Sequence, residues 1–327
     1  MKALVYTGER SLSYQQVSDP ALEAGENLIR VESVGICGSD MHAYLGHDER
    51  RPAPLILGHE AAGTVIEGPM TGKRVTVNPL VTCGTCEACL EGRNNLCPTR
   101  QIISMPPREG GFAELLRMPS DNLVELPDGF SVDKAALAEP LAVCWHGVKV
   151  AHHAMVRPMD KARCLVIGGG AIGLGSALAL QAFGAAEIVL AETNPLRRDY
   201  LHGRFDGTVS DSSQVNGPFD MVVDAAGFRA TREMASALAK PGGVICHIGL
   251  GDSNDGLDIR RATLQEITFV GTYTYTPQDF RDTVAAMISG DLGDLDWVQF
   301  RGLDEGAEAF SDLLSARIEA PKVILHP

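Results

Sequence analysis

Residues 163–175 read RCLVIGGGAIGLG, in which an apolar strand runs into a glycine-rich turn and then into a helix. The glycines form the pattern G-x-G-x-x-G. In such a unit the first glycine allows a tight turn, the second lets backbone N–H groups approach a pyrophosphate, and the third lets helix and strand pack closely. The helix N-terminus favours the same anion. We therefore predict a dinucleotide site in this turn, and the predicted contacts are Gly168, Gly170, Ala171, Ile172 and Gly173.

The alternative is a glycine-rich turn that binds nothing, because the pattern alone is a weak signal. Glu192 argues against it, since this residue closes the next predicted strand about 20 residues further on, where an acidic side chain accepts hydrogen bonds from the ribose. A carboxylate there would also repel the 2′-phosphate of NADP. Arg197 and Arg198 follow and could recruit that phosphate. We give Glu192 more weight, so the predicted cofactor is NAD, with Arg197 close to it.

The pattern of predicted strands and helices changes at about residue 143. Residues 143–276 alternate apolar strands with helical patterns, which predicts a doubly wound parallel sheet, the Rossmann arrangement. Residues 1–142 are rich in short strands and Gly/Pro turns, which predicts a β-rich domain. Residues 277–327 follow the sixth strand of the parallel sheet and are predicted to return to the first domain. The predicted fold class is thus α/β, with two domains in a chain of 327 residues.

Four cysteines lie close together in the stretch CGTCEACLEGRNNLC, residues 83–97. The spacing C-x2-C-x2-C-x7-C can point four thiolates at one Zn²⁺ and make a closed tetrahedral site. Disulfides would need an oxidising compartment, and a redox C-x-x-C pair would leave two cysteines idle. We predict a structural zinc lobe whose ligands are Cys83, Cys86, Cys89 and Cys97.

Three further segments, GICGSDMHAY, GHEAAG and ALAEPLAV, carry a mixed set of reactive side chains. A thiolate, an imidazole and one or two carboxylates suit a catalytic zinc that keeps one position open. Each residue alone also has a structural interpretation, as a small buried hydrophobe, a core histidine or a surface charge. Spacing by itself leaves that choice open. The candidate residues are Cys37, Ser39, Asp40, His42, His59, Glu60 and Glu139.

These motifs stand in the order found in zinc-dependent medium-chain alcohol and polyol dehydrogenases, which the chain resembles over nearly its whole length. It is most similar to the branch of sorbitol, L-idonate, galactitol-phosphate and threonine dehydrogenases, because Glu139 stands where other alcohol dehydrogenases carry a cysteine ligand. The resemblance implies a GroES-like β domain (1–142 and 277–327) and a Rossmann domain (143–276), with the active cleft between them.

The resemblance also implies a catalytic zinc site. Cys37 and His59 would bind the metal, and Glu60 and Glu139 would be direct or water-mediated ligands that can exchange. Asp40 would orient the zinc-binding histidine, as carboxylates commonly do for a metal-bound imidazole. Together with the four-cysteine lobe this gives two zinc ions per chain, one catalytic and one structural.

The proton relay and the substrate pocket follow from the same resemblance. Ser39 would pass the substrate proton onward, and His42 would be the exit of that relay. Tyr44 lies one position later than the tyrosine of sorbitol-type enzymes, and Thr274 and Tyr275 stand where those enzymes carry an Arg-Tyr pair. These three residues are the predicted substrate contacts, and the missing arginine weakens the case for sorbitol itself and for a phosphorylated polyol.

The predicted activity is an NAD-dependent oxidation of a secondary alcohol, in a polyol or sugar-derived compound, to a ketone. A threonine-type amino-alcohol dehydrogenase is the alternative within enzymes, since it shares the glutamate at position 139. The alternative from another class is a dinucleotide-binding sensor that keeps the structural zinc and has lost turnover. The complete set of catalytic ligands argues against the sensor.

Charge and hydropathy limit the partners. The formal net charge of −14 disfavours nucleic acid, whose phosphates an acidic surface repels. No apolar stretch is long enough to cross a bilayer, and the first residues lack the apolar run of a signal peptide, so we expect a cytoplasmic location and no membrane partner. The β-rich run EITFVGTYTY, residues 266–275, could pair across a two-fold axis, and the resemblance implies a homodimer or homotetramer.

Overall fold

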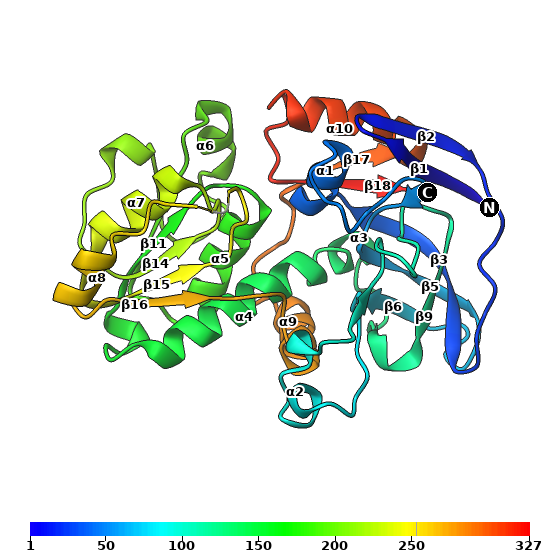
Figure 1. The fold of residues 1–327 in the computed structure, drawn as a ribbon, viewed down its shortest axis with the longest axis horizontal. Helices are drawn as coiled ribbons and strands as arrows, with labels where there is room; N and C mark the ends of the chain where they lie inside the picture. Colours follow the sequence, from blue (N-terminus) through cyan, green and yellow to red (C-terminus); the bar gives the residue numbers. More distant parts are fainter. Residues whose placement is uncertain (253) are drawn as a thin grey trace.

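The computed structural model describes residues 1–252 and 254–327 and arranges them in two lobes (Figure 1). The long helix α4 (Ala138–Ala154) runs between the lobes. No helix in the described ranges combines the length and the apolar character that a membrane span requires.

One lobe is built on a parallel sheet of six strands in the order β13-β12-β11-β14-β15-β16. Every neighbouring pair in this sheet is parallel. Strand order reverses at β11, which is the switch point where doubly wound sheets bind ligands beyond the carboxyl ends of their strands. The predicted doubly wound parallel sheet is confirmed. The strands are β11 (Arg163–Ile167), β12 (Glu187–Ala191), β13 (Thr208–Ser210), β14 (Phe219–Asp224), β15 (Ala239–His247) and β16 (Thr268–Gly271).

Both faces of this sheet are buried, because alternate side chains of a strand point to opposite faces. Cys164 and Val166 of β11 lie in a core cluster with helices α4 and α5. Leu165 and Ile167 lie in a second cluster with residues of α7 and the segment around α8. The helices of this lobe are α5 (Ala171–Ala182), α6 (Pro195–Leu201), α7 (Arg229–Leu238) and α8 (Ile259–Leu264).

The other lobe is β-rich and holds a seven-stranded sheet in the order β10-β6-β5-β3-β18-β17, with β9 also paired to β3. A three-stranded sheet, β2-β1-β4, packs beside it. The strands of the lobe are β1 (Lys2–Gly8), β2 (Ser11–Gln16), β3 (Glu26–Gly35), β4 (Leu55–Ile56), β5 (Glu60–Glu67), β6 (Arg74–Val77), β9 (Leu115–Pro119), β10 (Leu123–Glu125), β17 (Val298–Gly302) and β18 (Lys322–His326). Its helices are α1 (Gly38–Tyr44), α3 (Val132–Ala135) and α10 (Gly306–Leu314).

The chain crosses back to the β-rich lobe after the parallel sheet. Strand β18 pairs antiparallel with β3 and parallel with β17, so one of the last strands lies beside one of the first. Helix α9 (Pro277–Ser289) does not cross with it, because Phe280, Val284 and Met287 pack in the same core cluster as α4. Helices α4 and α9 therefore form the junction, and Asp279 of α9 accepts from His146 and Lys149 of α4, both at 2.7 Å.

The four-cysteine segment forms a small lobe on the β-rich side, drawn in cyan at the bottom of Figure 1. Its base is the short hairpin of β7 (Leu80–Val81) and β8 (Gln101–Ile102), which are antiparallel. Between them lie helix α2 (Glu87–Leu90) and a single 3₁₀ turn, Asn94–Leu96.

Candidate functional site

The four cysteines of the small lobe converge on one point. Their sulfur atoms all lie within 4.8 Å of one another, with Sγ–Sγ distances of 4.0 Å for Cys83–Cys89 and 3.6 Å for Cys83–Cys97. Four thiolates at 2.3 Å from one tetrahedral Zn²⁺ stand about 3.8 Å apart, so the set fits a closed zinc site. Backbone N–H groups of Thr85 and Cys86 lower the pKa of the Cys83 thiol to about 5, which favours the thiolate that a metal needs.

The structure also brings together a second set of donors, which come from two segments of the sequence. One ligand atom each from Cys37, His59 and Glu60 lies within 4.8 Å of the other two. Cys37 immediately precedes α1, and Glu60 opens β5, which pairs with β3 so that Glu60 faces Gly35. A side chain at Gly35 would force Glu60 to move, because an added Cβ would lie 2.0 Å from Glu60 Oε2.

Asp40 contacts both segments that carry this second set of donors. It is fully buried in α1, where its Oδ2 accepts from the Cys37 N–H at 2.9 Å and its Oδ1 from the Gly58 N–H at 3.3 Å. Its Oδ1 also lies 3.6 Å from Nδ1 of His59. Asp40 therefore contacts the backbone on both sides of the cluster and faces the imidazole that it was predicted to orient.

The chemistry of the second set suits a bound cation. Among the described residues, Glu60 Oε2 is buried without a hydrogen-bond partner, and such an atom is costly unless something satisfies it. Burial alone would lower the pKa of His59, yet the Cys37 thiol and the Asp40 carboxylate raise it well above its usual value. The same negative surroundings would stabilise a metal ion in place of that proton. The residues present therefore fit the zinc that their donor types predict.

Lys322 is a charged partner of this site that sequence reasoning missed. Its Nζ, on β18, donates to Glu60 Oε1 at 2.6 Å and to the Ile36 carbonyl at 2.9 Å, and both side chains are buried. Burial would lower the pKa of Lys322, but Glu60 and Cys37 raise it above its usual value, so the ammonium is charged. The available signal was a lysine at the head of the apolar run KVILHP, where a buried charge needs a partner.

Glu139 lies near this cluster without joining it. It sits in the first turn of α4, buried, and its Oε1 accepts a hydrogen bond from the Tyr275 hydroxyl at 3.0 Å. Burial raises the pKa of Glu139 to about 7; the positive charge of His59 opposes this shift and the negative charge of Glu60 adds to it. The structure thus places Glu60 within 4.8 Å of Cys37 and His59, whereas Glu139 is not part of that group.

Ser39 and His42 lie on α1, one turn apart and both half-buried. Arg51, which sequence reasoning also missed, reaches Ser39 from the following loop. Its guanidinium donates to the Ser39 carbonyl at 3.2 Å and its Nη2 lies 3.4 Å from the Ser39 Oγ. Asp48 pairs with the buried Arg51 at 2.7 Å. Because a guanidinium only donates, the Ser39 hydroxyl faces a fixed positive neighbour.

The glycine-rich turn has the geometry that its pattern predicts. Gly168 has a φ of 101°, and an added Cβ on Gly173 would lie 1.7 Å from the Gly168 carbonyl oxygen. Helix α5 begins directly after Gly170, with Ala171 and Ile172 in its first turn. The turn therefore needs glycine at both 168 and 173, and it leaves the helix N-terminus open to an anion.

Glu192 follows β12 at the mouth of that turn. Its Oε2 accepts from the Gly169 N–H at 2.8 Å and its Oε1 from the Asn194 N–H at 2.7 Å. Arg197 donates to the Ile318 carbonyl of the β-rich lobe at 3.1 Å, while its buried Nε has no partner among the described residues. Arg198 donates to the Glu192 carbonyl at 3.0 Å and pairs with Asp211 at 2.8 Å.

The three predicted substrate contacts have different surroundings. Tyr44 is buried in the β-rich lobe, where its ring packs edge-on against Phe310 with centroids 5.3 Å apart. Tyr275 is 1% exposed and faces Glu139. Thr274 is half-buried, with a φ of 46° and a buried Oγ1 that has no partner within the described part of the chain. Tyr44 and Tyr275 are buried, so both side chains contribute to packing. Thr274 is the most exposed of the three predicted substrate contacts.

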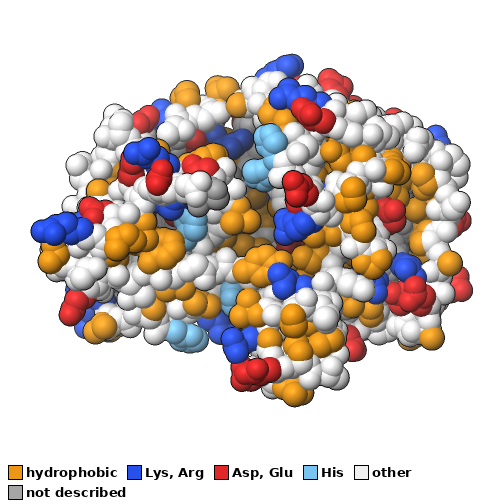
Figure 2. All heavy atoms as spheres, viewed as in Figure 1, with side chains coloured by type: hydrophobic (Ala, Val, Ile, Leu, Met, Phe, Trp, Pro, Cys, Tyr) orange, Lys and Arg blue, Asp and Glu red, His pale blue; other side chains and the backbone are white. Residues whose placement is uncertain are grey.

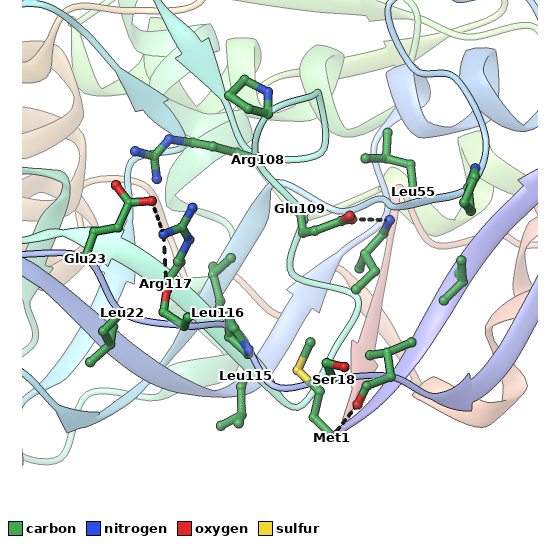
Figure 3. A pocket seen from close by; sticks show the side chains of 18 of the residues that line it. Met1, Ser18, Leu22, Glu23, Leu55, Arg108, Glu109, Leu115, Leu116 and Arg117 are labelled. Carbon is green, nitrogen blue, oxygen red and sulfur yellow. Dashed lines mark hydrogen bonds and ion pairs between the residues drawn. The ribbon is translucent and has the colours of Figure 1, made fainter.

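The surface is hollowed between the two lobes, as Figure 2 shows on the face seen in Figure 1. A separate groove of about 630 Å³ lies on the outside of the β-rich lobe (Figure 3). Its charged groups are paired, Arg117 with Glu23 at 2.5 Å and Glu109 with the Ile56 N–H at 2.7 Å. None of the predicted site residues lines this groove.

Comparison with known proteins agrees with this geometry. Residues 23–128 match the family model of the alcohol dehydrogenase GroES-like domain, and residues 171–289 match that of the zinc-binding dehydrogenases. The chain is 31% identical to a sorbitol dehydrogenase of Bacillus subtilis, over 100% of this chain and 97% of that one. It is 32% identical to an L-galactonate-5-dehydrogenase of Escherichia coli, over 89% and 88%.

A solved structure shares the fold. A protein of Sinorhizobium meliloti, described as a zinc-binding dehydrogenase and solved bound to NADP, superposes with a TM-score of 0.89 at 27% identity. The superposition covers 100% of this chain and 99% of that one.

Proposed function

Since the chain belongs to the zinc-dependent medium-chain dehydrogenases, in their polyol dehydrogenase branch, we propose that it oxidises a secondary alcohol of a polyol or sugar-derived compound to a ketone, with NAD as hydride acceptor. The observation that carries the proposal is the cluster of Cys37, His59 and Glu60, in which His59 and Glu60 are buried and Cys37 is half-buried. A thiolate, an imidazole and a carboxylate within reach of one ion are the donors of a catalytic zinc site.

We propose that Cys37 and His59 hold the catalytic zinc and that Glu60 is its nearest carboxylate. Glu139 would be a second carboxylate, which can bind the metal directly or through water. The four cysteines of the small lobe would hold a second, structural zinc. A catalytic zinc acts as a Lewis acid that lowers the pKa of a bound hydroxyl group.

The chain's own residues would orient the substrate and move its proton. Asp40 keeps His59 facing the cluster, which fixes the direction of that ligand. Ser39 would accept the hydroxyl proton of the alcohol, and His42, one turn along the same helix, would release it to solvent. Arg51 would orient the Ser39 hydroxyl, because it donates toward the Ser39 Oγ and so leaves the hydroxyl hydrogen of Ser39 to point elsewhere.

A substrate screen tests the proposal. Polyols, aldonates and threonine would be offered with NAD⁺, and NADH absorbance would be followed together with the zinc content of the protein. We expect turnover of a polyol or aldonate and two zinc ions per chain. Turnover of threonine alone would favour the amino-alcohol alternative. One zinc per chain with no turnover would favour a dinucleotide-binding sensor.

Cofactor choice gives a sharper prediction. We expect kcat/KM for NAD⁺ to exceed that for NADP⁺ by at least ~100-fold, about 2.7 kcal/mol, because a 2′-phosphate would meet Glu192. Arg198 is already paired with Asp211, and Arg197 donates to the Ile318 carbonyl of the other lobe, so we give Glu192 more weight than either arginine. Steady-state rates with both cofactors measure this ratio.

The matched variants are Glu192→Ser and Glu187→Ser, at opposite ends of strand β12. Glu192→Ser should narrow the gap between the cofactors, whereas Glu187→Ser should leave it unchanged. Equal efficiency of the parent with NAD⁺ and NADP⁺ would show that Glu192 does not select the cofactor.

We further propose that residues 143–276 bind the dinucleotide and that residues 1–142 and 277–327 form the catalytic domain, whose metal ligands all lie in residues 1–142. We also propose that the chain forms homodimers or homotetramers. Strand β16 supports an oligomer, since it is the edge of the parallel sheet and Phe269 on it is 39% exposed. An exposed edge strand invites a partner strand. Phe269→Lys should shift the mass measured by light scattering to that of a smaller species, and an unchanged mass would place the interface elsewhere.

A further inference from the structure

We propose that Tyr275 is a positioning residue that holds Glu139 at the catalytic site, and that the four-cysteine lobe fixes Tyr275 by docking on residues 272–276. This inference rests on the proposed function, because it takes Glu139 as a carboxylate of the catalytic zinc site. It gives the small lobe a part in the reaction, in addition to any contribution to stability.

The contact between Tyr275 and Glu139 is the first element. The phenol donates to Glu139 Oε1 at 3.0 Å, and both side chains are buried. The ring of Tyr275 packs against Phe280 of α9 with centroids 5.5 Å apart, so packing fixes the direction of the hydroxyl. A carboxylate held at one oxygen loses rotational freedom, and partners of this kind tune metal ligands in many sites.

The backbone next to Tyr275 is strained, which is the second element. Thr274 has a φ of 46°, and its side chain is β-branched. A β-branched residue in the left-handed region is a true outlier, and such strain persists only where the surroundings hold it. The segment between β16 and α9 must therefore be clamped from outside for Tyr275 to keep its place.

The small lobe contacts Tyr273, the residue on the other side of Thr274. Asn95, buried in the 3₁₀ turn of that lobe, donates to the Tyr273 carbonyl at 2.8 Å. Arg100, just beyond the last cysteine, lies 4.9 Å over the Tyr273 ring. Asn95 and Arg100 flank Cys97, so the metal-binding cysteines determine where both side chains lie. The lobe thus contacts Tyr273, and Glu139 accepts a hydrogen bond from Tyr275. The strained Thr274 lies between these two tyrosines.

Tyr275→Phe tests the first contact in the full-length, metal-loaded enzyme. Cobalt(II) placed in the catalytic site reports its ligands through the visible absorption spectrum, and a chelator measures how fast the metal leaves. We expect an altered cobalt spectrum, metal loss about 10–100-fold faster, and a lower kcat, because losing a partner that orients a metal-site residue has effects of this size.

Tyr200→Phe is the matched control, since it removes the same hydroxyl from a half-buried ring on α6. It should leave the spectrum and the metal loss unchanged. If the parent binds cobalt and oxidises alcohol but Tyr275→Phe matches it in spectrum and metal loss, Tyr275 only fills the core and the inference is overturned. If the parent itself has no catalytic metal and no turnover, the proposed function fails instead.

Asn95→Ala tests the second contact, with Asn94→Ala as its neighbour control. Asn95→Ala should keep the metal of the four cysteines yet reproduce the spectral change and faster metal loss of Tyr275→Phe. The double variant should be no worse than Tyr275→Phe alone, because residues in one chain of contacts are not additive. Additive effects, or a normal spectrum in Asn95→Ala, would separate the lobe from the site and overturn that half of the inference.

Discussion

Cys37→Ser should abolish alcohol oxidation, with kcat/KM falling by about 10³-fold or more, while the protein stays folded. Its thiol is one of the three donors that converge beside α1, and a Lewis acid worth several kcal/mol would be lost with it. The zinc content should fall from two ions per chain to one. Metal analysis and NADH absorbance on the same preparation measure both effects.

Two other cysteines complete this test. Cys89→Ser should instead destabilise the small lobe and lower the soluble yield, because a closed site contributes directly to folding. Cys164→Ser, in the buried strand β11 and remote from both metal clusters, should keep both zinc ions. Retention of most activity in Cys37→Ser would refute the catalytic assignment.

Lys322→Met should lower the free energy of unfolding by about 3–5 kcal/mol, because it leaves the buried Glu60 carboxylate without its ion-pair partner. The methionine keeps most of the volume, so a cavity does not explain the loss. Chemical denaturation followed by circular dichroism gives the shift in midpoint.

The control is Lys73→Met, which removes an exposed lysine from its pair with Glu125. Exposed pairs contribute little, so the midpoint should barely move. Adding Glu60→Gln to Lys322→Met should restore part of the lost stability, since an amide costs less to bury than an unpaired charge. If Lys322→Met were as mild as Lys73→Met, the buried pair would not support the fold.

Local patterns predicted the parts of the molecule whose residues are close in the chain. The strand, turn and helix of residues 163–182 are dictated by the positions of three glycines and a run of apolar side chains. The four-cysteine lobe is equally local, because its ligands lie within residues 83–97. In both cases one short segment contains the whole physical requirement.

The parts that escaped prediction depend on pairing between distant segments. Lys322 meets Glu60 only because β18 pairs with β3, and no spacing within either strand shows that register. Tyr275 was expected to contact substrate, yet its hydroxyl meets Glu139 across the junction of α4 and α9. Arg51 follows another arginine in a loop, where a solvated charge is the ordinary expectation, but it is buried beside Ser39.

The place of β18 beside β3 has a consequence for synthesis on the ribosome. Glu60 emerges 262 residues before Lys322, a delay of roughly 10–50 s at ordinary rates of elongation. The parallel sheet spans residues 163–271 without interruption, so all its strands are available while the β-rich lobe still lacks β17 and β18. During that interval Glu60 lacks its ion pair with Lys322, and Val34 and Gly35 of β3 lack their β18 neighbours. All strands of the parallel sheet are therefore translated first, and the sheet of the β-rich lobe is completed only when β18 has been translated.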